Sequence, residues 1–120
     1  MISNLAEFLK RYGFTPVVYD NIIRVFDEEL PVYIEIKLDT GKIYTSIGFT
    51  NELREVFDEM SSSGEDVEEA VDEALSRLNE CALLVKKWAE SRNLITIFEL
   101  REGSAELLSL VEEYMEGLNE

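Results

Sequence analysis

The apolar residues near the start of the chain have the spacing of a short helix. Between residues 5 and 12 they recur every three or four positions and so share one helical face. We expect Ser3 or Asn4 to cap this helix at its beginning. Gly13 is suited to end it, because glycine readily adopts the left-handed conformation that follows many helices.

From residue 15 to residue 49 the spacing changes to alternation. Turn-forming residues interrupt the alternating stretch, which predicts a meander of four strands. The strands are expected at residues 16–19, 22–26, 32–38 and 43–49. Asp20-Asn21 and the segment Asp39-Thr40-Gly41-Lys42 are the predicted hairpin turns.

The second turn fixes the register of the second hairpin. It places Leu38 opposite Ile43 and Ile34 opposite Ile47, so that apolar side chains collect on one face. A shift by one residue would place Leu38 opposite Lys42 and mix the two faces. The in-register pairing is therefore predicted.

The other face of the predicted sheet is rich in aromatic residues. If the hairpins form one sheet, this face collects Tyr19, Ile22, Phe26, Tyr33 and Tyr44, with Arg24 and Lys37 among them. Tyr33 lies opposite Gly48, and Lys37 lies opposite Tyr44. Two interpretations stay open: a helix covers this face, or the face contacts a partner or a second copy. Base stacking is disfavoured, because the acidic surroundings would repel phosphate.

After residue 50 the helical spacing returns. It predicts a helix over Leu53–Met60, a break at Ser61–Gly64, and a long helix capped at Ser62 or Ser63 that reaches about Glu90. A strand at residues 94–100 is apolar on both faces, so we expect it to be well covered. A last helix is expected to begin at Gly103-Ser104. Its predicted inward side chains are Leu107, Leu108, Val111, Tyr114, Met115 and Leu118.

The long helix has an apolar seam whose steps alternate between four and three residues. Its members are Val67, Val71, Ala74, Leu78, Cys81, Val85 and Trp88. The seam is expected to pack on the chain's own sheet, and a strict 3.5-residue repeat also suits pairing of two such helices in a dimer. Cys81, the single cysteine, is expected to be a buried, inert thiol.

These elements predict one α+β domain over residues 1–120. Its sheet has about five strands and is mainly antiparallel, with a meander of four strands and one later strand. The long helix and two short terminal helices pack against it.

The formal net charge of −15 is unevenly placed. Residues 1–50 carry 7 acids and 5 bases (−2), whereas residues 51–120 carry 19 acids and 6 bases (−13). This balance disfavours nucleic acid and anionic membranes and favours basic partners. Abundant glutamate without histidine or glutamine is also typical of thermophile proteins. Neither a membrane helix nor a signal peptide is indicated, so a cytoplasmic location is expected.

The residue types exclude several kinds of catalysis. Without histidine there is no Ser-His or Cys-His nucleophile, and no Gly-rich phosphate loop or zinc cluster occurs. The spacing Glu52-x-x-Glu55 followed by Glu69-x-x-Asp72 is similar to that of all-helical nucleotide pyrophosphohydrolases. That resemblance implies a magnesium-dependent enzyme. Helical periodicity, however, directs these carboxylates away from the apolar faces. If those faces pack together, the carboxylates point outward and cannot converge on one ion.

A weak divalent-cation site on the acids of residues 65–73 is a further alternative.

The acidity and the order of elements are similar to those of small chaperones of bacterial secretion systems, which are dimers that bind extended segments. This chain departs from them by placing four strands before its long helix.

We predict a non-enzymatic protein-interaction module that forms a homodimer, without cofactor, metal or catalytic residues. The alternatives are a phosphate-mimicking inhibitor of a nucleic-acid-binding protein and the magnesium-dependent enzyme. The predicted interaction residues are Tyr19, Phe26, Tyr33, Lys37 and Tyr44 on the sheet, and Val71, Leu78, Val85 and Trp88 on the seam.

Overall fold

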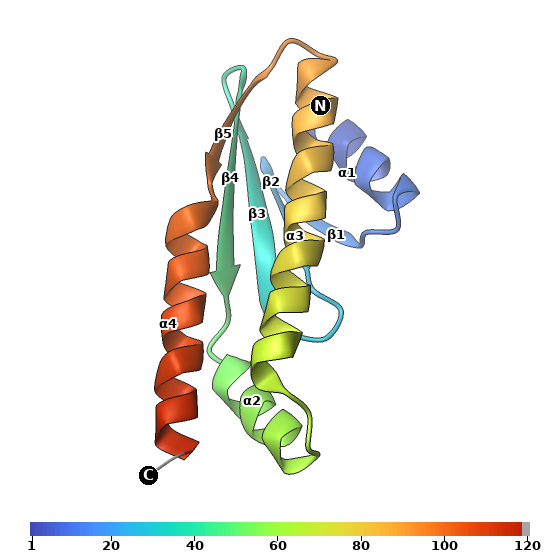
Figure 1. The fold of residues 1–120 in the computed structure, drawn as a ribbon. Coiled ribbons are helices and arrows are strands. Elements are labelled where there is room, and N and C mark those ends of the chain that lie inside the picture. Colours follow the sequence, from blue (N-terminus) through green and yellow to red (C-terminus); the bar gives the residue numbers. More distant parts are fainter. Residues whose placement is uncertain (119–120) are drawn as a thin grey trace.

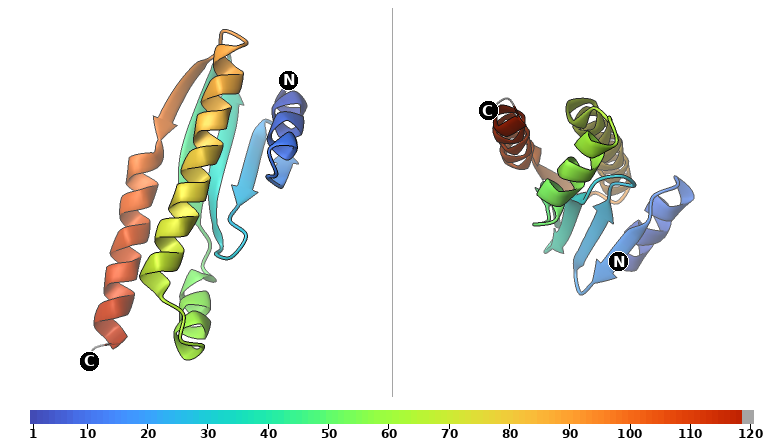
Figure 2. Two further views of the ribbon diagram at one scale, coloured as in Figure 1. Left: turned by 45° about the vertical axis from the view of Figure 1, so that its right-hand side comes forward. Right: turned by 90° about the horizontal axis from the view of Figure 1, so that it is seen from below.

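One five-stranded sheet carries the helices of residues 1–118 on one of its faces (Figures 1 and 2). The computed structural model describes these residues. The elements are α1 (Ile2–Arg11), β1 (Pro16–Tyr19), β2 (Ile22–Phe26), β3 (Val32–Asp39), β4 (Lys42–Phe49), α2 (Leu53–Ser62), α3 (Val67–Glu90), β5 (Ile95–Glu99) and α4 (Leu100–Leu118). The strands lie side by side in chain order, and β5 runs parallel to β4. The predicted α+β class and mainly antiparallel sheet are confirmed.

The register of the β3–β4 hairpin agrees with the one predicted. Leu38 pairs with Ile43, Ile34 with Ile47, and Tyr33 with Gly48. The turns use the left-handed backbone that tight hairpins need: φ is 54° at Asp20 and 77° at Gly41. Because side chains alternate along a strand, this register decides which residues face the helices and which face away.

The core lies between the inner face of the sheet and the helices. Ile23, Ile34 and Ile36 are fully buried on the sheet, and Leu5 and Leu9 of α1 join them. Fully burying an aliphatic side chain of this size contributes about 1.5–3 kcal/mol. Helix α3 crosses the same face and, as the central helix, touches α1, α2 and α4.

A buried ion pair ties the loop after β2 to α3. The Asp27 carboxylate accepts hydrogen bonds from Arg77 Nε at 2.7 Å and Nη2 at 3.1 Å, and from the backbone amides of Glu29 and Leu30. Burial acts to raise the pKa of Asp27, but these hydrogen bonds outweigh it, so its pKa is lowered. The ion pair thus holds the loop and the helix together. Its Asp27 side chain is fully buried, and its Arg77 side chain is partly exposed.

Helix α4 is fastened to the rest of the molecule at two places. At Gly103 the helix lies so close to β4 that a Cβ atom would come within 2.0 Å of the Ile47 carbonyl oxygen. Further along, the Tyr114 hydroxyl lies 2.9 Å from an Asp58 carboxylate oxygen, and the Tyr114 ring contacts Phe57. One end of α4 is therefore set by β4 and the other by α2.

Two predicted helix starts were wrong in detail. Helix α1 begins at Ile2, and neither Ser3 nor Asn4 makes a side-chain cap. The cap of α3 is Asp66, whose side chain accepts a hydrogen bond from the Glu69 amide, rather than Ser62 or Ser63. The serines close α2 instead: Ser63 donates a hydrogen bond to the Glu59 carbonyl, as residues after a helix often do.

The region after α3 also differs from the prediction. Strand β5 was expected to be covered, but it is an edge strand, and Ile95 on it is 60% exposed. Helix α4 begins at Leu100 instead of Gly103-Ser104, and its 19 residues do not make it short. Leu108 and Leu118, expected to face inward, are exposed. Because β5 is the last strand of the sheet, it has a neighbouring strand on one side only, and this leaves more of it exposed.

Candidate interaction surface on the sheet

The side of the sheet that faces away from the helices is not covered by any element of residues 1–118 (Figure 2). We call this surface the open sheet face. It contains the outward side chains of all five strands, as the registers place them: Val17, Tyr19, Ile22, Arg24, Phe26, Tyr33, Glu35, Lys37, Asp39, Lys42, Tyr44, Ser46, Gly48, Ile95, Ile97 and Glu99. None of them is buried. The five predicted sheet residues Tyr19, Phe26, Tyr33, Lys37 and Tyr44 are therefore brought together on one accessible surface.

Arg24 organises the aromatic half of this face. Its guanidinium carbon lies 4.5 Å from the ring centre of Tyr33 and 5.5 Å from that of Tyr19. Arg24 Nε donates a 2.9 Å hydrogen bond to Glu35, and this bond raises the pKa of the guanidinium. Stacking and a directed hydrogen bond hold these side chains in one arrangement.

Tyr33 is at the centre of the same half. Its ring lies 5.0 Å from that of Phe26, and its end lies over Gly48, where an added Cβ would be 2.7 Å from the ring. The predicted pairing of Tyr33 with Gly48 is confirmed, and it places the aromatic ring over the glycine. Tyr19 and Phe26 remain 39% and 40% exposed beside it. Tyr19, Arg24, Phe26 and Tyr33 thus form a contiguous group of large side chains that we call the aromatic ridge.

The other half of the open sheet face is hollowed. A depression of about 300 Å³ is lined by the outward side chains Glu35, Lys37, Asp39, Tyr44, Ser46 and Glu99. We call it the polar hollow. Three of its lining residues are acidic (Glu35, Asp39 and Glu99) and one is basic (Lys37). The aromatic ridge, in contrast, carries the cation Arg24. The two halves of the face therefore differ both in shape and in the sign of their charges.

The open sheet face as a whole is electrically balanced. Arg24, Lys37 and Lys42 carry three positive charges, and Glu35, Asp39 and Glu99 carry three negative ones. The complete chain has a net charge of −15. Most of the excess negative charge therefore lies on other surfaces of the molecule, and this face repels an acidic protein less than they do.

The seam residues of α3 belong to the core instead. Val71 and Val85 are fully buried, and Leu78 and Trp88 are 2% exposed, all within the chain's own fold. The expected packing of the seam on the chain's own sheet is confirmed, and within the described chain these four side chains present no surface to a partner. Cys81 lies on the same seam, and burial raises its pKa to about 12, as expected of an inert thiol.

The carboxylates considered as metal ligands do not come together. In the part of the chain that the structure describes, no three Asp, Glu or Cys side chains are placed to hold one ion. This includes Glu52 just before α2, Glu55 on α2, and Glu69 and Asp72 on α3.

The members of the open sheet face that β5 contributes, Ile95, Ile97 and Glu99, were not anticipated from the sequence. Ile97 pairs with Tyr44 and extends the face onto β5. Its position depends on β5 joining the sheet beside β4, which is a contact between residues about fifty positions apart. The alternation within β5 was visible in the sequence, but its neighbour was not.

No family model matches the chain, and comparison with curated proteins and with solved structures finds no match either. No helix within residues 1–118 is both long and apolar enough to cross a membrane. The function must therefore be inferred from the surfaces of the molecule.

Proposed function

We propose that this protein is a non-enzymatic interaction module whose open sheet face binds a second copy of the chain. The observation that carries this proposal is the uncovered aromatic ridge beside the polar hollow. Apolar surface that no element covers favours association, because contact removes it from water. A second copy is the partner that offers both complementary shapes at once.

A two-fold arrangement satisfies both halves of the face together. In such a dimer the same patch is used twice, so the ridge of each copy enters the hollow of the other. Arg24 of each copy then approaches the acidic rim formed by Asp39 and Glu99. Within one copy the ridge and the hollow differ in shape and charge. Between two copies each ridge is complementary to the hollow that it meets.

The size of the face suits a dimer. Five strands about 4.8 Å apart and about 20 Å long give a rectangle of roughly 500 Å². Standing aromatic side chains present more surface than a flat rectangle. A standard interface takes about 800 Å² from each partner, so the whole face is needed.

Charge also favours this face over the others. Two copies that each carry −15 repel one another over most approaches. Contact through a neutral patch brings the fewest like charges close together. Because the remaining repulsion is screened by salt, dimer formation should strengthen as salt rises from low to physiological concentration.

The test is the molar mass in solution, measured by light scattering over a range of protein concentrations. We expect a species of twice the chain mass of 13.8 kDa. Tyr44→Glu should raise the dimer dissociation constant at least about tenfold, because each interface would then bury two unpaired carboxylates. Far-UV circular dichroism should remain unchanged.

Leu83→Glu is the matched control. Leu83 is 66% exposed on α3, so the same kind of change there leaves the open sheet face intact. Its dimer dissociation constant should equal that of the wild type. A monomeric wild type, or equal effects of the two substitutions, would disprove the proposal.

A further inference from the structure

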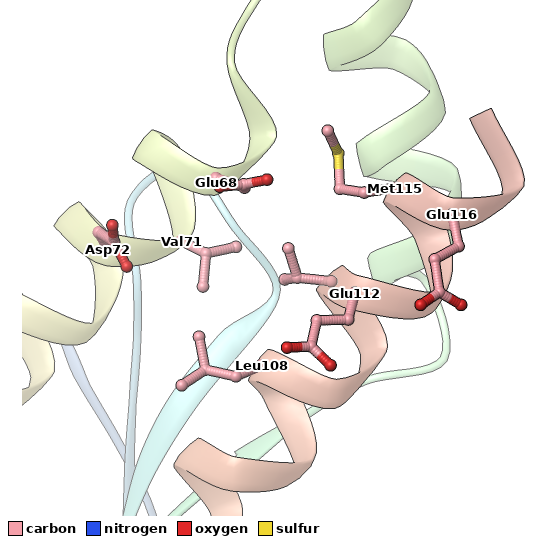
Figure 3. A pocket seen from close by; sticks show the side chains of 8 residues that line it. Glu68, Val71, Asp72, Leu108, Glu112, Met115 and Glu116 are labelled. Atoms are coloured by element: carbon pink, nitrogen blue, oxygen red, sulfur yellow. The ribbon is translucent and has the colours of Figure 1, made fainter. Parts of the chain in front are cut away.

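A second apolar surface lies on the helical side of the molecule. Helices α3 and α4 leave between them a groove of about 580 Å³. It is lined by four apolar and four acidic residues. Figure 3 shows Val71 from α3 and Leu108 from α4 directed toward each other across it. We call it the helix groove. Because its lining comes from α3 and α4 alone, it is separate from the open sheet face.

The floor of the helix groove is apolar. Val71 and Val111 are buried beneath it, Met115 is half-buried, and Leu108 is 44% exposed. Leu108 therefore presents apolar surface to solvent inside a concave site. Such a position favours an apolar side chain from a partner.

The two sides of the groove are acidic. Glu68 and Asp72 stand on α3, and Glu112 and Glu116 stand on α4 (Figure 3). Each pair is four residues apart and so occupies successive turns of its helix. No basic residue lines the groove, and none of these four acids joins a salt bridge with another described residue.

The groove continues toward the end of α4. A second hollow of about 430 Å³ shares Glu68 and Met115 with it and adds Glu65 and the exposed Leu118. The apolar strip with acidic edges is therefore longer than one small molecule needs. Its length suits a segment of polypeptide.

We propose that the helix groove binds a basic amphipathic helix of another protein. A helix with one apolar stripe places Lys and Arg on both flanks of that stripe, facing the acids on both sides of the groove. In an extended segment successive side chains point to opposite sides. Bases next to the apolar residues would therefore point away from the acids of the groove. Two antiparallel helices with a space between them also provide the ridges against which a third helix packs.

Other occupants fit less well. The acids repel nucleic-acid phosphate and anionic lipid. A second copy of this chain would bring further negative charge, since its described helices α2, α3 and α4 carry most of the excess acids. The binding of a basic helix therefore adds a function to the proposed dimer and does not depend on it.

The test uses a synthetic amphipathic peptide of about 18 residues, made only of Leu and Lys, with the leucines on one helical face. Binding to the full chain is measured by fluorescence anisotropy at physiological salt. We expect saturable binding to one groove per chain. A scrambled Leu/Lys peptide and a Leu/Glu peptide of the same pattern should both bind much more weakly.

Two double variants separate the groove from the general charge of the protein. Glu68→Gln with Glu112→Gln removes one acid from each side and should weaken binding about tenfold, at about threefold for each charge. Glu80→Gln with Glu113→Gln removes the same charge from exposed positions on the same helices outside the groove. This control should change binding by less than about twofold.

The floor has its own variant. Leu108→Ser should weaken binding about tenfold, because a leucine contact is lost from a water-excluded site. Since Leu108 is exposed, the fold should remain, as checked by thermal melting. The Tyr44→Glu variant should still bind the peptide even as a monomer.

Several results would overturn the inference. These are absence of peptide binding, equal binding of the scrambled peptide, or equal weakening by both double variants. The last two results would show that the peptide responds only to the protein's overall charge, as a phosphate mimic would require. Unchanged binding in Leu108→Ser would show that the groove is not the site.

Discussion

Thr45 is a polar residue that the core encloses completely. It stands on the inner face of β4 opposite Ile36, and its hydroxyl oxygen has no hydrogen-bond partner. Trp88 Nε1 is in the same situation on α3. An unpaired buried polar group reduces stability, because its hydrogen bonds with water are lost on folding.

Thr45→Val should therefore stabilise the protein. Valine has nearly the same shape and removes the unpaired hydroxyl, so the free energy of unfolding should rise by about 1 kcal/mol. Urea denaturation followed by circular dichroism measures it. Thr45→Ser, which keeps the hydroxyl and loses a methyl group, should lower the same free energy by about 1 kcal/mol. A stability loss in Thr45→Val would show that the hydroxyl has a partner.

At the scale of elements, the position of α4 depends on one close contact with β4. Gly103 is buried in the helix, and the Ile47 carbonyl occupies the space where a side chain would begin. The obstacle is backbone in the centre of the sheet rather than a flexible side chain. The helix would have to move away from β4 to accept any larger residue.

Gly103→Ala and Gly117→Ala should consequently have opposite effects. Gly103→Ala should destabilise the protein by about 3 kcal/mol through overpacking, despite the better helix propensity of alanine. Gly117 also lies in α4, with no atom near the site of its missing Cβ. There the same change should stabilise by up to about 1 kcal/mol. Thermal melts of both variants test this, and a neutral Gly103→Ala would contradict the close packing.

At the scale of the whole molecule, the Asp27–Arg77 pair connects the sheet layer to the helical layer. Since the pKa of Asp27 is lower in the folded chain than its ordinary value of 3.8, the charged form favours folding. This stabilisation is complete above the ordinary value and is lost as the pH falls below 3.8 through the folded-state pKa. The pair therefore predicts a contribution to acid unfolding that a variant can isolate.

Asp27→Asn should reduce the free energy of unfolding by about 1–2 kcal/mol at pH 7. The difference between wild type and variant should shrink as the pH falls from about 5 to 2, because the wild-type carboxyl then becomes neutral as well. Urea denaturation at each pH measures this difference. The overall charge of −15 affects both proteins almost equally and cancels in the comparison. A difference that stays constant with pH would contradict the assignment.

Local patterns were sufficient for most of the elements and for one register. Alternation and the turn at residues 39–42 determined the pairing of β3 with β4, because a shift by one residue would have exposed the apolar face. The same alternation predicted the five sheet residues of the candidate surface, Tyr33 over Gly48 among them. Helix starts were less certain, since Ser62, Ser63 and Asp66 all suit a cap, and the exact turn decides among them.

What the sequence determined by itself was therefore the content of each face: apolar side chains on one side of the meander, aromatic side chains on the other, and a seam along the long helix. Only the tertiary structure decided which of these faces meet. It buried the seam of α3 and placed β5 beside β4. It also directed Leu108 into the groove between α3 and α4 and left the aromatic face uncovered. The physical reason is that periodicity follows from local backbone geometry. Covering a face depends on contacts between distant segments, for which one apolar surface is as suitable as another.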